Sequence, residues 1–81
     1  MAMILRLREV RESLGLLPHE ARAEYAAQFG EVIPFWTWNR WEREDALPNI
    51  IRLRRLSQLY RLPMERLFHD DIRGLVFDDF Y

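Results

Sequence analysis

Two neighbouring side chains in the segment FWTWNRWERE, Asn39 and Arg40, carry the hydrogen-bonding groups that read bases in duplex DNA. From the major groove, an arginine can bind guanine through two hydrogen bonds, and an asparagine can bind adenine in the same way. In a helix of 3.6 residues per turn, Trp38 and Trp41 share one face, and Asn39 and Arg40 lie on the other. The spacing therefore predicts a helix with an aromatic inner face and an outer face that suits a major groove.

Trp36 and Arg43 fall on the same outer face, and Phe35 stands at the start of the segment. An apolar ring at Phe35 or Trp36 could contact the methyl group of thymine. The same two aromatic residues could instead be core residues, or they could form a protein-binding surface, since tryptophan is enriched at binding hot spots. The residues alone leave these three interpretations open.

Catalytic and metal chemistry find little support in the residue types. The chain has no cysteine, which excludes disulfides and thiolate zinc sites. His19 and His69 are 50 positions apart, without further metal-type spacing, so surface histidines are expected. There is no glycine-rich phosphate loop and no nucleophile–base arrangement. We expect neither enzymatic activity nor a cofactor or metal.

Membrane insertion and secretion are not expected either. No apolar run approaches the roughly 18 residues of a membrane span. Charged side chains interrupt the first 17 residues, which is not the pattern of a signal peptide. The expected location is the cytoplasm.

The charge is unevenly distributed, although the net charge is only −1. Residues 1–69 carry 11 arginines against 9 acids, a balance of +2, whereas residues 70–81 carry one arginine against four aspartates, a balance of −3. A basic surface is the usual electrostatic footprint of a nucleic-acid binder. The main part of the chain therefore allows weak attraction to DNA.

Proline, glycine and apolar periodicity predict the elements that would position these side chains. Leu7, Val10 and Leu14 recur at helical spacing before Gly15, and Pro18 suits the first position of the next helix. The predicted helices cover residues 3–14, 18–29, 34–42, 49–60 and 63–69. The positions predicted to face inward from the second and fourth helices are Tyr25, Ala26, Phe29, Ile50, Leu53, Leu56, Leu59 and Tyr60. The arginines predicted to form a solvated face on the fourth helix are Arg52, Arg54 and Arg55.

The C-terminal segment 72–81 differs from the helical domain predicted over residues 1–71. Gly74 breaks a helix, and residues 75–77, Leu-Val-Phe, have strand propensity. Phe80 and Tyr81 are large apolar residues at a terminus, where chains usually fray. The segment is expected either to pack on its own domain or to contact a second subunit or a partner protein.

Residues 38–68, WNRWEREDALPNIIRLRRLSQLYRLPMERLF, resemble the second half of a helix-turn-helix domain of the Cro/C1-type repressor (XRE) family. The first helix, LREVRESLGL, is similar to the opening of the same family. The chain departs from the family between Gly15 and Trp41, which are 26 positions apart, longer than the usual spacing. The resemblance implies an all-α fold, a five-helix lambda-repressor-like helix-turn-helix domain with a short C-terminal extension.

The resemblance also assigns roles to single residues. It places Phe35 and Trp36 where the recognition helix faces base edges, and it places Thr37, Asn39 and Arg40 at the remaining groove-facing positions. It also implies burial of Trp38 and Trp41 and an ion pair between Arg11 and Glu42. Apart from the resemblance, Arg43, just past the predicted recognition helix, suits a phosphate contact, and Asn49 suits a second one because a helix start attracts anions. His19 or Arg22 would take the place of the glutamine with which the family grips a phosphate early in its second helix.

These expectations describe a sequence-specific DNA-binding transcriptional regulator, a small repressor that acts as a homodimer on double-stranded DNA. Two copies would place their recognition helices in successive major-groove turns, about 34 Å apart. The alternative is a protein-interaction module on a helix-turn-helix scaffold, which would bind another protein through exposed aromatic residues and the acidic tail. Phosphate contacts release counterions, so the salt dependence of DNA binding separates the two hypotheses.

Overall fold

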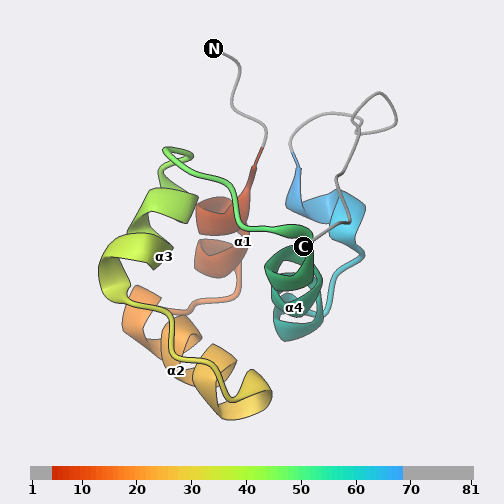
Figure 1. Cartoon of the computed structure of the whole chain (residues 1–81). Coiled ribbons are helices and arrows are strands. Elements are labelled where there is room, and N and C mark those ends of the chain that lie inside the picture. The colour runs from red at the N-terminus through yellow and green to blue at the C-terminus, as the bar shows by residue number, and fades with distance from the viewer. Residues whose placement is uncertain (1–4, 69–81) are drawn as a thin grey trace.

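The computed structural model describes residues 5–68, and all of their regular structure is helical apart from a single β-bridge (Figure 1). The all-α class predicted from the sequence is confirmed. The elements are α1 (Leu7–Ser13), α2 (Pro18–Phe29), α3 (Phe35–Glu42), α4 (Ile50–Tyr60) and the 3-10 helix η1 (Met64–Leu67). A single 3-10 turn thus stands where a fifth helix over residues 63–69 was predicted, and His69 and the extension at 72–81 lie outside the described residues.

Glycine and asparagine set the helix ends that the sequence predicted. Gly15 and Gly30 have φ angles of +72° and +68°, a left-handed conformation that costs glycine little after a helix. Asn49 caps α4, because its Oδ1 accepts a hydrogen bond from the backbone N–H of Arg52 at 2.9 Å. Single residues at the helix ends therefore determine where these helices begin and end.

The core lies where all four α-helices and η1 meet. Its most deeply buried large side chains come from four elements: Tyr25 of α2, Trp38 of α3, Leu56 of α4 and Leu67 of η1. In Figure 1, α3 forms one flank of the molecule, packed on α1 and α2, while η1 lies on the opposite flank beside α4. One outer side of α3 is consequently left without a covering helix among the described residues.

Four positions on the predicted apolar helix faces are less buried than expected, among them Leu59 of α4, which is only partly buried. Leu14 is 50% exposed, because α1 ends at Ser13 and the next residue no longer follows the helical face. Ala26 and Phe29 are only partly buried, whereas Ala21, one turn earlier, is fully buried. The buried residues of α2 are therefore Ala21 and Tyr25, and Phe29 packs at the edge of the core.

The two ends of the described chain meet. Leu5 forms an antiparallel bridge with Phe68, and the N–H of Arg6 donates to the carbonyl of Leu67 at 2.7 Å. The N–H of Leu5 also donates to Oε1 of Glu44, at 2.6 Å. Glu44 has a φ of +62°, a strained conformation for a residue with a side chain, and its carboxylate thereby reaches the start of the chain.

Candidate nucleic-acid interface

A turn over residues 30–34 sets the angle between α2 and α3. Gly30 ends α2, Ile33 is buried at 3% exposure, and Pro34 precedes the first residue of α3. The Nε of Arg22 in α2 donates to the carbonyl of Ile33 at 3.0 Å. The turn is held by an apolar anchor on its inner side and by an arginine from the neighbouring helix.

Glu31 joins the same turn to α4. Its carboxylate accepts hydrogen bonds from Nη2 of Arg52 at 2.7 Å, Nη1 of Arg55 at 2.9 Å and the hydroxyl of Tyr25 at 3.0 Å. Hydrogen bonding by Arg52, followed by that of Tyr25, holds the pKa of Glu31 below its ordinary value. Of the three arginines predicted on a solvated face of α4, only Arg54 is fully in the exposed class. Arg52 and Arg55 are partly buried, because both form ion pairs with Glu31.

The inner face of α3 is aromatic and buried, as predicted. Trp38 and Trp41 are 2% and 4% exposed. The ring of Trp38 meets Tyr25 of α2 edge to face, with centroids 5.9 Å apart and planes at 79°, a favourable arrangement for aromatic pairs. The helix is therefore fixed in rotation about its own axis, and this rotation decides which side chains face outward.

A buried ion pair braces α3 against α1, which confirms the predicted pairing of Arg11 with Glu42. The guanidinium of Arg11 donates from Nε to Oε2 of Glu42 at 2.7 Å and from Nη2 to Oε1 at 3.0 Å, and the two side chains are 7% and 6% exposed. Nε1 of Trp38 donates to the same carboxylate at 3.0 Å, and Nη1 of Arg11 donates to the carbonyl of Leu16 at 2.7 Å. The hydrogen bond to Glu42 raises the pKa of Arg11.

The outer face of α3 begins with two exposed aromatic rings. Phe35 is 55% exposed and Trp36 is 63% exposed, so the interpretation of these two residues as core is wrong. The guanidinium carbon of Arg22 lies 5.7 Å from the centre of the Phe35 ring, a cation–π distance that steadies the ring. Arg40 is exposed one turn later, and among residues 5–68 no carboxylate lies within ion-pairing distance of it.

The other predicted DNA-contacting residues occupy different surroundings. Thr37 and Asn39 are half-buried on the flanks of α3. Arg43 is exposed, with Nε 3.5 Å from Oδ2 of Asp45, a weak surface pair. Asn49 is half-buried at the start of α4, where its side-chain oxygen Oδ1 already caps the helix by accepting a hydrogen bond from the N–H of Arg52. Phe35, Trp36, Thr37, Asn39 and Arg40 thus lie on α3, Arg43 follows directly after it, and Asn49 precedes α4.

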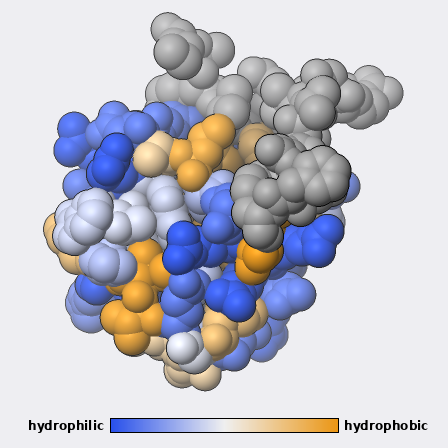
Figure 2. Space-filling view, in the orientation of Figure 1, coloured by the Kyte–Doolittle hydropathy of each residue, from blue (hydrophilic) through white to orange (hydrophobic). Residues whose placement is uncertain are grey.

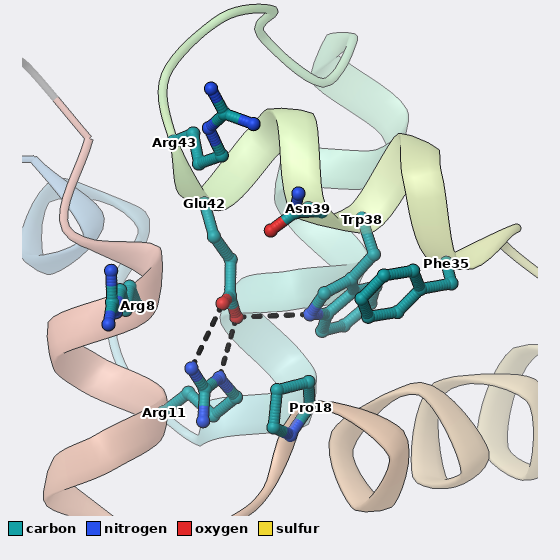
Figure 3. A pocket seen from close by; sticks show the side chains of 8 residues that line it. All are labelled: Arg8, Arg11, Pro18, Phe35, Trp38, Asn39, Glu42 and Arg43. Atoms are coloured by element: carbon teal, nitrogen blue, oxygen red, sulfur yellow. Dashed lines mark hydrogen bonds and ion pairs between the residues drawn. The ribbon is translucent and has the colours of Figure 1, made fainter.

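A hollow of about 210 Å³ opens between α1, the start of α2 and α3 (Figure 3). The residues that line it are Arg8, Arg11, Pro18, Phe35, Trp38, Asn39, Glu42 and Arg43. Figure 3 shows the Arg11–Glu42 pair along one wall and Asn39 pointing into the open space. Asn39 and Phe35 therefore face this hollow as well as solvent.

Sequence reasoning missed two residues that shape this surface. Glu31 holds two arginines of α4, and Arg8 borders the hollow from α1. Glu31 gave no local signal, because its partners are 21 and 24 positions away. The helical position of Arg8, three before Arg11 on α1, could have indicated that both face α3.

Neither a membrane span nor a metal cluster is found among the described residues. Within residues 5–68 no helix is long and apolar enough to cross a membrane. In the same range, no three histidine, aspartate or glutamate side chains gather as a metal site would require. His19 is exposed at the start of α2.

Comparisons of this chain with protein-family models, with curated proteins and with solved structures find no match.

Proposed function

We propose that this protein binds double-stranded DNA as a helix-turn-helix domain, with α3 as the recognition helix. The observation that carries the proposal is the division of α3 into two faces. Trp38 and Trp41 hold one face in the core, while Trp36 and Arg40 remain exposed on the other and Phe35 is exposed at the edge of the helix that borders the hollow. A helix presented in this way fits the width of a major groove.

The polar groups on this surface suit the parts of a DNA duplex that each would meet. The guanidinium of Arg40 has the donors that guanine accepts, and the Asn39 amide can pair with adenine. The rings of Phe35 and Trp36, together with the Thr37 methyl, suit thymine methyl groups. Arg43 and the capped start of α4 at Asn49 suit phosphates on either side, since helix starts attract anions.

The finer proposal is a five-helix, lambda-repressor-like domain of the Cro/C1 type, with η1 in place of the last helix. It would act in the cytoplasm as a homodimeric repressor on a two-fold operator. Support comes from the quoted resemblance, from the buried Arg11–Glu42 pair that the resemblance implied, and from the order of α1 to α4. The described residues carry 11 arginines against 9 acids, a balance of +2 that favours attraction to phosphate.

The test is a selection from random duplex DNA with the purified full chain, followed by titration of the selected duplex at several salt concentrations. A DNA-binding regulator should enrich one sequence and lose affinity steeply as salt rises. Absence of enrichment, together with absence of a salt slope on mixed duplex, would contradict the proposal.

A second candidate function rests on a different observation, the apolar surface around the start of α3. Val32, shortly before α3 in the sequence, is 76% exposed, and Phe35 and Trp36 at the start of α3 are 55% and 63% exposed. On the face seen in Figure 2, hydrophobic surface is visible in several places between hydrophilic side chains. Clusters of exposed apolar residues of this kind mark protein-binding sites.

In this alternative, the protein is an interaction module that binds another protein through these aromatic residues and the acidic tail. Replacement of Trp36 by serine would then abolish capture of the partner protein, whereas replacement of Arg40 would have little effect. If the protein binds DNA, replacement of Arg40 should instead weaken the binding of duplex DNA, because a contact with a base would be lost. The paired variants therefore decide between the two candidates.

A further inference from the structure

We infer that the hollow between α1, α2 and α3 holds one phosphate of the DNA backbone, gripped by Arg8 and Arg43. This inference rests on the proposed DNA-binding function and adds to it a contact from α1 that the sequence did not indicate. Three arginines and one glutamate line the hollow, a formal balance of +2. The ligand class is a phosphodiester, and we assign it to duplex DNA because α3 forms one wall.

The acidic group in the hollow does not repel an anion strongly. Both oxygens of Glu42 accept hydrogen bonds from Arg11, and Oε2 also accepts one from the Trp38 indole. The carboxylate is only 6% exposed, so its charge is compensated within the wall. The uncompensated charges that line the open space are those of Arg8 and Arg43, each of which has one exposed acidic neighbour outside the lining, Glu12 and Asp45.

Arg8 and Arg43 are held loosely enough to turn toward a ligand. Nε of Arg8 is 3.4 Å from Oε2 of Glu12, and Nε of Arg43 is 3.5 Å from Oδ2 of Asp45. Both arginine side chains are more than 60% exposed, and exposed ion pairs of this length contribute little to stability. A phosphate, with its full charge and several acceptor oxygens, would compete well for both guanidinium groups.

The remaining lining fits a backbone site beside a base-reading helix. Asn39 also lines the space, and its polar amide group lies at its edge (Figure 3). Pro18 marks the start of the 12-residue helix α2, whose dipole is positive at that end. The hollow also borders Phe35, so an occupied site would set how deeply the start of α3 enters the groove.

Two pairs of matched variants of the full chain test this inference on the selected duplex and on mixed duplex. Arg8→Gln removes a gripping cation, and Arg66→Gln removes an exposed cation from η1, on the flank opposite α3. Glu12→Gln releases Arg8 from its partner, and Glu24→Gln removes an exposed acid of α2 that borders another hollow. Circular dichroism checks that each variant is folded.

We expect Arg8→Gln to weaken binding about tenfold on both duplexes and to lower the salt slope by about 1, as the loss of one phosphate contact should. Arg43→Gln should act in the same way, and Arg66→Gln should leave the slope unchanged. Glu12→Gln should strengthen binding more than Glu24→Gln does, an increase that damage to the fold cannot produce.

The outcomes separate this inference from the proposed function. If the parent protein binds duplex DNA but Arg8→Gln and Arg66→Gln have equal slopes, the phosphate site is rejected and DNA binding stands. If the parent binds no duplex, both proposals fail. A parent protein that binds inorganic phosphate alone, detected from chemical shift changes of the Asn39 amide and lost in Arg8→Gln, would assign the hollow to a free anion and overturn the DNA assignment.

Discussion

Arg40 differs from Arg11, Arg22 and Arg43, since its guanidinium makes neither a hydrogen bond nor an ion pair within residues 5–68. Arg11 is buried against Glu42, Arg22 is bonded to a backbone carbonyl, and Arg43 leans toward Asp45. An unpaired guanidinium keeps all five donors for an external acceptor. At the scale of single residues, this makes Arg40 the best candidate for direct base reading.

Arg40→Ala should cost about 1–3 kcal/mol of binding free energy on the selected duplex and should relax the preference at one base pair. Titrations of the parent and the variant on the selected duplex, and on a copy changed at that base pair, would measure this. Arg54→Ala is the matched control, because Arg54 is also exposed but lies on α4. An equal loss on selected and random duplexes would mean that Arg40 holds only phosphate.

The Arg11–Glu42 pair gives a prediction about stability. Glu42→Leu should lower the free energy of unfolding by about 3–5 kcal/mol, because Arg11 would remain charged, buried and unpaired. The double variant Arg11→Met, Glu42→Leu should be more stable than Glu42→Leu alone, although both remove the acceptor of the Trp38 indole. Urea unfolding of the four proteins in the cycle would measure the coupling energy, and a value near zero would rule out the brace.

At the scale of elements, the sequence predicted α2, α3 and α4 closely, because their ends carry local signals. Gly30 and Asn49 fix the helix ends with their own backbone and side-chain chemistry. The inner tryptophans followed from spacing alone. The contacts of Glu31 and the exposure of Leu14 did not follow, because one depends on residues more than 20 positions away and the other on where α1 stops. The roles of Phe35 to Arg43 on DNA stay predictions.

The turn between α2 and α3 should be sensitive to acid. The pKa of Glu31 is lowered in the folded protein, so its stabilising contribution is complete above the ordinary value of 4.5 and is lost as pH falls below it through the folded value. Thermal unfolding followed from pH 7 to pH 3 should show a smaller decrease in stability for Glu31→Gln than for the parent. Glu24→Gln, which replaces an exposed glutamate of α2, should follow the parent curve.

At the scale of the whole molecule, residues 72–81 lie outside the described residues, and their predicted role is association. The core of residues 5–68 already draws on all five helical elements, so it should fold without the extension. Five large apolar residues in the last seven positions would be costly to leave in water, at about 25 cal/mol per Å². A contact with a second copy would bury them on both subunits.

Deletion of residues 72–81 should therefore leave a folded, helical, monomeric protein that binds DNA more weakly. Sedimentation of the truncated and full-length chains at matched concentrations would measure the change in mass. If both forms are dimers, the interface lies elsewhere. If the truncated form unfolds, the extension belongs to the core.

The β-bridge between Leu5 and Phe68 joins the two ends of the described chain, so that the residues between them form a loop closed by non-covalent pairing. The two partners of this bridge are 63 positions apart. Closing so long a loop costs entropy before any contact is gained, whereas the helix pairs within the loop require shorter closures. The loop should therefore close after the folding transition state. Leu5→Ala should speed unfolding in stopped-flow experiments while leaving the folding rate nearly unchanged, and a slower folding rate would place loop closure in the nucleus instead.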